Sequence, residues 1–162
     1  GVTGTINPWY VGVMGADMAE KYGLSKSQNR GSSSRVDLVY WDDEMVDVFS
    51  EYVCYKETIT DPALKAAKRQ AVYEEKGMAQ NIVFYVMLFN SGPGVLQLAP
   101  FNFHVYLITP DGSRVKAERY DEVLDRALNP NGETRGFIYF PRYNVSGQPL
   151  LCGGRPKLHL EE

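Results

Sequence analysis

Apolar side chains are most concentrated at residues 81–90, which read NIVFYVMLFN. Successive side chains of a β-strand point to opposite faces, so the even-numbered residues from Ile82 to Leu88 would face one side and the odd-numbered residues from Val83 to Phe89 the other. Both sets are apolar, and a strand that is apolar on both faces is covered on both. The pattern therefore predicts a strand at the centre of a sheet.

Two stretches before this run also alternate between apolar and polar residues, at residues 35–41 and 45–56. Alternation with a period of two is typical of strands with one buried face. The acidic triplet Asp42-Asp43-Glu44 between them fits a solvated turn, because it lacks the spaced, glycine-containing pattern of a calcium-binding loop. We therefore predict a β-hairpin or two adjacent strands here.

One helix is predicted, at about residues 62–76. An aspartate and a proline stand at its start, where they favour a helix N-terminus, and Gly77 follows its end. Good helix formers fill its interior. A narrow apolar stripe at helical spacing runs along it, formed by Leu64, Ala67 and Ala71 with Val72 as a further candidate member. We expect a crossover helix whose stripe packs against a sheet.

The second half of the chain alternates apolar stretches with turn sequences. The turns SGPG, TPDG and NPNG combine the residues that tight turns favour. In the strand that follows the first turn, Phe103 is expected to face inward and Tyr106 outward. Residues 121–128 and 141–156 are expected to form a helical turn or irregular segments. Strands are predicted at residues 101–107, 115–120, 134–140 and 157–161.

Many short strands, regularly spaced turns and one inserted helix predict an all-β fold in the main, an antiparallel sandwich of two sheets. Residues 35–162 would form this single domain. Residues 1–34 would be a partly irregular prefix with a flexible linker, since residues 25–34 contain no apolar side chain. Trp9 and Tyr10 in this prefix are too apolar to stay in water, so they either dock on the sandwich or form a partner surface.

Length and charge argue against some broad classes of protein. The chain has 162 residues, which suits one domain, and a net charge of −3. It contains no long basic run, so nucleic-acid binding driven by counterion release is not expected. Its longest apolar runs reach about ten residues, half the length of a membrane-spanning helix. No transmembrane segment is expected either.

Two cysteines, Cys54 and Cys152, lie far apart in the sequence. Such a pair is compatible with one disulfide in an exported protein. The alternative is two buried, reduced cysteines that only pack. Neither stands in a CxxC motif or close to a histidine in sequence, so redox catalysis and zinc binding are not expected.

No pattern in the chain indicates catalysis. The two histidines, His104 and His159, stand on predicted strands, where a surface position is expected. No serine lies in a G-x-S-x-G elbow, and no glycine-rich segment matches a phosphate-binding loop. The carboxylates of residues 121–125 lie beside arginines, as on a solvated surface. We predict no catalytic residues, no metal site and no cofactor, and we do not expect an enzyme.

Aromatic side chains are the remaining candidates for function. Tyrosine and tryptophan are enriched at protein interfaces, and their rings also stack on sugars. A thin sandwich core cannot bury all of them. The alternative is that they cover strand surfaces, as aromatic residues commonly do in sheets. The candidate binding residues are Trp9, Tyr10, Trp41, Tyr106 and Tyr143.

The order of features in the second half resembles a known group of domains. These features are the strand that ends at Asn90, the pair Phe101 and Phe103, the turn Pro110-Asp111-Gly112, the strand 136–140, and the final pair Leu158 and Leu160. Over residues 79–161 this order is similar to the immunoglobulin-like sandwich domains of secreted bacterial proteins and lipoproteins. They include the immunoprotective extracellular domains and the families named after telomeric-repeat-binding factor. The resemblance implies an exported, non-enzymatic module, and it would suit a lipid anchor just upstream of Gly1.

Three functions are open on these grounds. The first is a non-catalytic, exported module that binds a protein partner at the cell envelope. The second is a small-molecule or carbohydrate binder that uses exposed aromatic rings, with a pocket between the helix at residues 62–76 and the sheet. The third, and least favoured, is a hydrolase.

Overall fold

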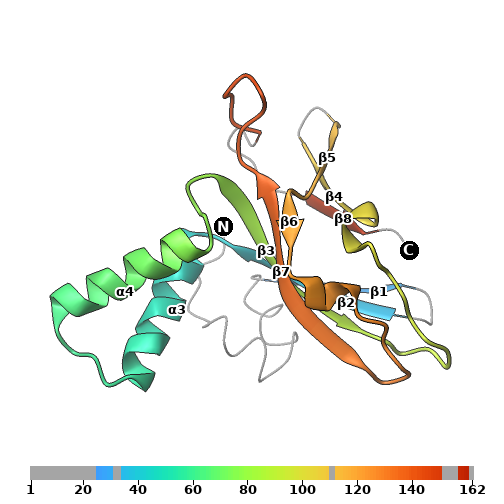
Figure 1. The fold of residues 1–162 in the computed structure, drawn as a ribbon, viewed down its shortest axis with the longest axis horizontal. Coiled ribbons are helices and arrows are strands. Elements are labelled where there is room, and N and C mark those ends of the chain that lie inside the picture. The colour runs from blue at the N-terminus through green and yellow to red at the C-terminus, as the bar shows by residue number, and fades with distance from the viewer. Residues whose placement is uncertain (1–24, 31–33, 110–111, 151–156, 161–162) are drawn as a thin grey trace.

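The computed structural model describes residues 25–30, 34–109, 112–150 and 157–160 of the chain (Figure 1). Its longer elements are two helices and four strands, and four shorter strands and two 3-10 turns complete it. In chain order these are β1 (Ser25–Arg30), β2 (Ser34–Trp41), α3 (Asp43–Lys56), α4 (Pro62–Glu75), β3 (Asn81–Phe89), η1 (Phe101–Phe103), β4 (Val105–Ile108), β5 (Arg114–Lys116), β6 (Arg119–Tyr120), η2 (Glu122–Asp125), β7 (Glu133–Pro141) and β8 (Lys157–Leu160).

The strands form two antiparallel sheets. The larger has the order β1-β2-β3-β7-β6, and the smaller has the order β5-β4-β8. An apolar core lies between them and takes side chains from both sheets, among them Phe84, Ile138 and Leu107. The predicted fold class, a mainly β, antiparallel two-sheet sandwich, is confirmed.

Strand β3 lies at the centre of the larger sheet, as its composition predicts. Its even-numbered side chains enter the core between the sheets. Of its odd-numbered side chains, Val83 and Met87 enter a second core on the opposite face, and Tyr85 packs against that core. This second core also contains Met45 of α3 and Val72 of α4. The helices therefore cover one face of β3 and the smaller sheet covers the other.

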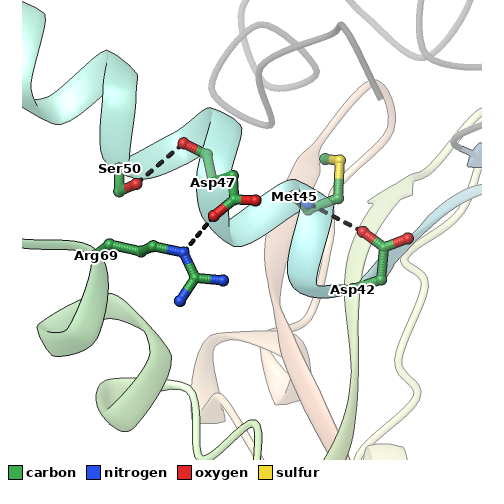
Figure 2. A network of polar contacts seen from close by, with 5 residues as sticks. All are labelled: Asp42, Met45, Asp47, Ser50 and Arg69. Atoms are coloured by element: carbon green, nitrogen blue, oxygen red, sulfur yellow. Dashed lines mark hydrogen bonds and ion pairs between the residues drawn. The ribbon is translucent and has the colours of Figure 1, made fainter. Parts of the chain in front are cut away.

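Residues 45–56 form most of helix α3, so the strand predicted there is wrong. The alternation at Val46, Val48 and Ser50 coexists with a helical pattern, in which the buried residues recur at Met45, Val46, Ser50 and Cys54. The preceding acidic triplet starts the helix instead of turning a hairpin. Asp42 is the N-cap, and its carboxylate accepts a hydrogen bond from the Met45 N–H at 2.9 Å (Figure 2).

Helix α4 occupies the predicted range, and Val72 of its predicted stripe packs in the core against the larger sheet, but the other three stripe residues do not. Leu64 is 57% exposed, and Ala67 and Ala71 are exposed as well. The helix lies along α3, and the two form a hairpin between β2 and β3 that extends away from the sheets (Figure 1). The insertion therefore holds two helices, where the sequence predicts one.

Ion pairs join the two helices along their length. Arg69 contacts the carboxylate of Asp47 near the base of the hairpin (Figure 2). Further pairs are Lys65–Glu51 at 3.3 Å and Lys68–Glu57 at 2.8 Å. Val72 is the buried residue of α4, and it lies in the core that also contains Met45 and Val46 of α3.

Three smaller predictions are corrected. Residues 25–30 are not part of a flexible linker but form β1, which pairs with β2 through the backbone and so needs no apolar side chains. Phe103 ends a 3-10 turn and is 61% exposed, whereas Tyr106, expected to face outward, is buried. The single strand predicted at residues 115–120 is divided between the sheets, because the chain crosses from β5 in the smaller to β6 in the larger.

Of the strand predicted at residues 101–107, the first part forms η1 and the rest begins β4, while residues 110–111 and 151–156 lie outside the described residues. β7 and β8 lie where strands are expected, and residues 121–128 contain the short turn η2. Among the described residues, neither helix has the length and apolar content needed to cross a membrane.

Replacing Asp42 tests whether it caps helix α3, which the alternating pattern did not predict. Asp42→Ala is expected to lower the free energy of unfolding by about 1 kcal/mol, because the Met45 N–H loses its acceptor. The matched control is Asp43→Ala, which removes an exposed carboxylate from the first turn and should cost about 0.3–1 kcal/mol at low salt only. Urea denaturation in high salt separates the two variants. Equal stability of both in high salt would contradict the capping role.

Candidate functional site

The structure places the predicted aromatic binding residues in different environments. Trp41 is 2% exposed and Tyr106 is 7% exposed, so the expectation that both lie on the surface is wrong. The Tyr106 hydroxyl accepts a hydrogen bond from Arg114 at 2.8 Å. Tyr143 is 41% exposed in the loop after β7. Trp9 and Tyr10 lie outside the described residues.

The disulfide also stays a prediction. Cys54 is buried on α3 and forms no disulfide within the described part of the chain. Cys152 lies outside that part. Among the described residues, no three histidine, cysteine or acidic side chains are grouped so that they could hold a metal ion.

Trp41 belongs to a group of side chains on the helix-facing side of the larger sheet, which we call the cation–aromatic cluster. Its members are Trp41, Lys76, Arg119, Phe137 and Tyr139. Backbone pairing aligns Trp41 with Val83, Val83 with Tyr139, and Tyr139 with Arg119. The cluster thus spans a row across β2, β3, β7 and β6, and Phe137 adds a second ring on β7.

Each cation of the cluster lies over the face of an aromatic ring. The Lys76 Nζ is 3.7 Å from the centroid of the Phe137 ring and 6.0 Å from that of Trp41. The Arg119 guanidinium carbon is 3.6 Å from the centroid of Tyr139. The Trp41 and Phe137 rings meet edge to face, with centroids 4.9 Å apart. Each cation–π contact contributes about 0.5–2 kcal/mol, with the larger values where water is excluded.

The end of α4 brings Lys76 to the sheet. Lys76 is the C-cap residue, and Gly77 follows with φ +61°, a left-handed conformation that favours glycine. A Cβ at Gly77 would also lie 2.9 Å from the Asn81 side-chain oxygen. The turn therefore requires glycine, and it directs the chain into β3 while the lysine lies over Phe137.

Asp121 supports the neighbouring strand of the cluster. Its carboxylate accepts a hydrogen bond from the Phe137 N–H at 2.7 Å. A Cβ at Gly136 would lie 2.9 Å from the Asp121 Cβ and 3.2 Å from Leu124. Glycine at this position lets the segment of η2 lie directly against β7, which holds the aspartate near the two cations.

Burial dominates the electrostatics of the cluster. The Lys76 side chain is only 13% exposed, and this burial lowers the pKa of its ammonium below 10.5, its ordinary value. The negative charges of Glu75 and Asp121 oppose that shift, while Arg119 adds to it. Burial likewise raises the pKa of the Tyr139 hydroxyl.

One donor of the cluster, the buried Trp41 Nε1–H, has no hydrogen-bond partner in the described structure. Lys76 forms an ion pair with its neighbour Glu75, whose Oε1 lies 4.0 Å from Nζ. Chemically, the cluster offers positive charge and an N–H donor beside aromatic rings, which suits binding more than proton transfer.

The sequence singles out Trp41 but neither cation of the cluster. Lys76 is a lysine at a helix end, and Arg119 stands among other charges, so neither has a distinctive local pattern. Their ring partners lie on β7, far away in sequence. Only the pairing of β7 with β3 and β6 brings them together.

A second candidate surface lies on the helical hairpin. Tyr55 of α3 is 81% exposed, and it is one of the residues that line an open hollow of about 530 Å³ near the α3–α4 connection. Cys54, Ile59 and Lys65 also line this hollow. It involves the two helices and their connection, unlike the pocket predicted between residues 62–76 and the sheet.

The desolvation of Lys76 can be measured directly. Its pKa is expected to lie below the ordinary lysine value in the folded protein, as followed by NMR of its ε-carbon during a pH titration. The unfolded chain then binds more protons between the lowered pKa and the ordinary one. The free energy of unfolding should therefore rise with pH across that interval.

Two variants supply opposite controls for the same titration. Arg119→Gln removes a neighbouring positive charge and should raise the pKa of Lys76, whereas Glu75→Gln should lower it further. A Lys76 that titrates at the ordinary value or above in the unmodified protein would contradict the desolvated environment.

Comparison with known proteins identifies one distant structural likeness. No family model matches the chain, and no curated protein matches it. An ApaG protein from Pseudomonas aeruginosa PAO1 is similar in structure, with 20% sequence identity and a TM-score of 0.34. The match covers 48% of this chain and 72% of that one. A likeness of this degree carries no argument about function.

Proposed function

We propose that the protein is a non-catalytic module that binds a protein partner through its helical hairpin. The observation that carries this proposal is the exposed apolar stripe of α4. Leu64, Ala67 and Ala71 are all exposed on one side of the helix. Their i, i+3, i+7 spacing is the one by which a helix enters an apolar groove of a partner.

The charges of the hairpin favour an outward position of the apolar stripe. The basic residues Lys65, Lys68 and Arg69 of α4 form ion pairs with acids of α3. Those contacts draw the basic side chains toward α3. The small alanine side chains of the stripe allow close approach of another protein, because interhelical distance depends on the side chains at the contact.

Tyr55 gives the hairpin a second exposed side chain, on α3. Its ring is among the most exposed large apolar groups of the described residues. Tyrosine is enriched among the residues that dominate binding energy at interfaces. An exposed tyrosine on α3 and an exposed apolar stripe on α4 together support a partner surface better than the stripe alone.

The cellular location is part of the proposal. The resemblance of residues 79–161 to immunoglobulin-like domains of secreted proteins and lipoproteins supports export, with lipid anchoring upstream of Gly1 as one arrangement. A partner at the cell envelope would follow from that location. Small-molecule binding is the second candidate function, and the cation–aromatic cluster favours it. A hydrolase stays the least favoured candidate.

Site-specific photo-crosslinking in the native cell tests the hairpin. A photoreactive residue at position 64 is expected to give one discrete crosslinked species. The matched control is the same residue at position 103, because Phe103 is equally exposed but lies far from the hairpin. Equal yields of the same species from both positions, or none from position 64, would contradict the proposal.

A charge substitution separates binding from folding. Leu64→Asp should weaken the crosslink formed from position 55 by about tenfold or more, because an unpaired charge would enter an apolar contact. Its free energy of unfolding should change by only about 0.5 kcal/mol, since the site is exposed. The comparison uses crosslink yield together with urea denaturation of the same variant.

A further inference from the structure

The connection between α3 and α4 forms the tip of the helical hairpin, away from both sheets (Figure 1). An open hollow of about 530 Å³ lies there, lined by the end of α3, the connection and Lys65 of α4, and we call it the tip hollow. Pockets that bind ligands have volumes of about 300–1,000 Å³. The tip hollow is therefore large enough to admit a side chain of another molecule.

The tip hollow combines apolar contacts with one unpaired cation. Among its lining residues, Cys54 is buried and Ile59 is half-buried. Lys65 also lines it, but its ammonium pairs with Glu51 at 3.3 Å. Lys56 is exposed and forms no ion pair with any of the described residues. An apolar group next to a negative charge would thus find a partner for each part here.

Thr58, another lining residue, holds a backbone conformation that costs energy. Both helices end in the same way, with a C-cap residue followed by a residue of positive φ. After α4 that residue is Gly77 at +61°, whereas after α3 it is Thr58 at +57°. A left-handed conformation suits glycine and is an outlier for a β-branched residue. Strain of this kind clusters at functional positions, so Thr58 marks the tip hollow as a candidate site.

We propose that the tip hollow is the pocket in which the hairpin recognises its protein partner, and that it takes a large apolar side chain next to an aspartate or glutamate. This inference rests on the proposed function and names the chemistry of that partner. The apolar side chain contacts Cys54 and Ile59, and the carboxylate pairs with Lys56. A protein segment fits better than a small molecule. Small-molecule sites bury most of their ligand, whereas this hollow is open and is lined in part by Tyr55, which is 81% exposed.

Selection from a random peptide library displayed on phage tests this chemistry on the full chain. Enriched peptides are expected to place a large apolar residue next to aspartate or glutamate. Thr60→Trp should abolish their binding, because it adds an indole ring to an exposed lining residue and fills the tip hollow. The matched control is Val95→Trp, which adds the same ring to the exposed loop between β3 and η1 and should leave binding unchanged.

A lysine substitution tests the charge in the tip hollow. Lys56→Gln should weaken binding of a synthetic copy of the selected peptide by about fivefold or more, since the carboxylate loses its cation. Lys116→Gln is the matched control, because Lys116 is an exposed lysine of β5 in the smaller sheet. This control should bind the peptide as the unmodified protein does. Fluorescence anisotropy of the labelled peptide measures both variants.

Thr58→Gly distinguishes a binding role from a structural one. Glycine adopts the left-handed conformation freely, so this variant should unfold at a higher urea concentration. It also removes a side chain that lines the tip hollow, so the peptide should bind at least about threefold more weakly. A gain in stability with unchanged peptide binding would contradict the functional interpretation of the strain.

Crosslinking from position 64 separates this inference from the proposed function. The crosslinked species should persist in Val95→Trp and fall by about tenfold or more in Thr60→Trp. A crosslink that persists in Thr60→Trp, a library that yields no enriched peptide, or selected peptides without an acidic residue would overturn the pocket while the partner surface holds. If position 64 gives no species when the tip hollow is unaltered, the proposed function is overturned, and the partner pocket with it.

Discussion

The burial of β3 on both faces is the constraint on which the rest of this structure depends. A strand whose two faces are apolar needs two separate layers to keep water away. The smaller sheet supplies one layer, and the hairpin of α3 and α4 supplies the other. Each full burial of a large apolar side chain contributes about 1.5–3 kcal/mol, so the packing of both layers against β3 stabilises the fold. The fold is consequently a three-layer arrangement around one strand.

This constraint explains why an antiparallel sandwich carries helices at all. β2 and β3 are adjacent and antiparallel, so a short turn could have joined them. The chain instead inserts a helical hairpin between them, and the base of that hairpin covers the odd-numbered face of β3. The outer part of the hairpin has no sheet beneath it. Ion pairs between α3 and α4 join the two helices there, and Leu64, Ala67 and Ala71 stay exposed.

The cation–aromatic cluster lies at the edge of the helical layer. There α4 ends, and Lys76 reaches over the rings of β7 beside the buried indole of Trp41. The aromatic rings compensate the cations in part, but they offer no acceptor to the indole N–H. Among the described residues, the Trp41 Nε1–H is the buried side-chain donor without a partner. Such a group in a packed fold calls for an explanation, since an unmet donor costs about 1–3 kcal/mol.

Several elements were predictable because a local pattern admits only one structure. The doubly apolar run of β3, the capped helix α4 and the strands β7 and β8 are of this kind. α3 was not, because residues 45–56 satisfy a period of two and a helical period together. Its cap, Asp42, looks the same in the sequence as a turn aspartate. Local propensity does not distinguish a strand from a helix at residues 45–56. The helix is favoured because it places Met45 and Val46 over Val83 and Met87.

The sequence by itself determined that the protein is a mainly β sandwich built on one central strand, since the period and extent of apolar residues depend on local backbone geometry alone. Only the tertiary structure decided that Trp41 is buried, that the stripe of α4 is exposed, and that Lys76 and Arg119 meet the rings of β7. The physical reason is that these contacts join residues far apart in the chain. Their position depends on strand register and layer packing, which no local pattern records.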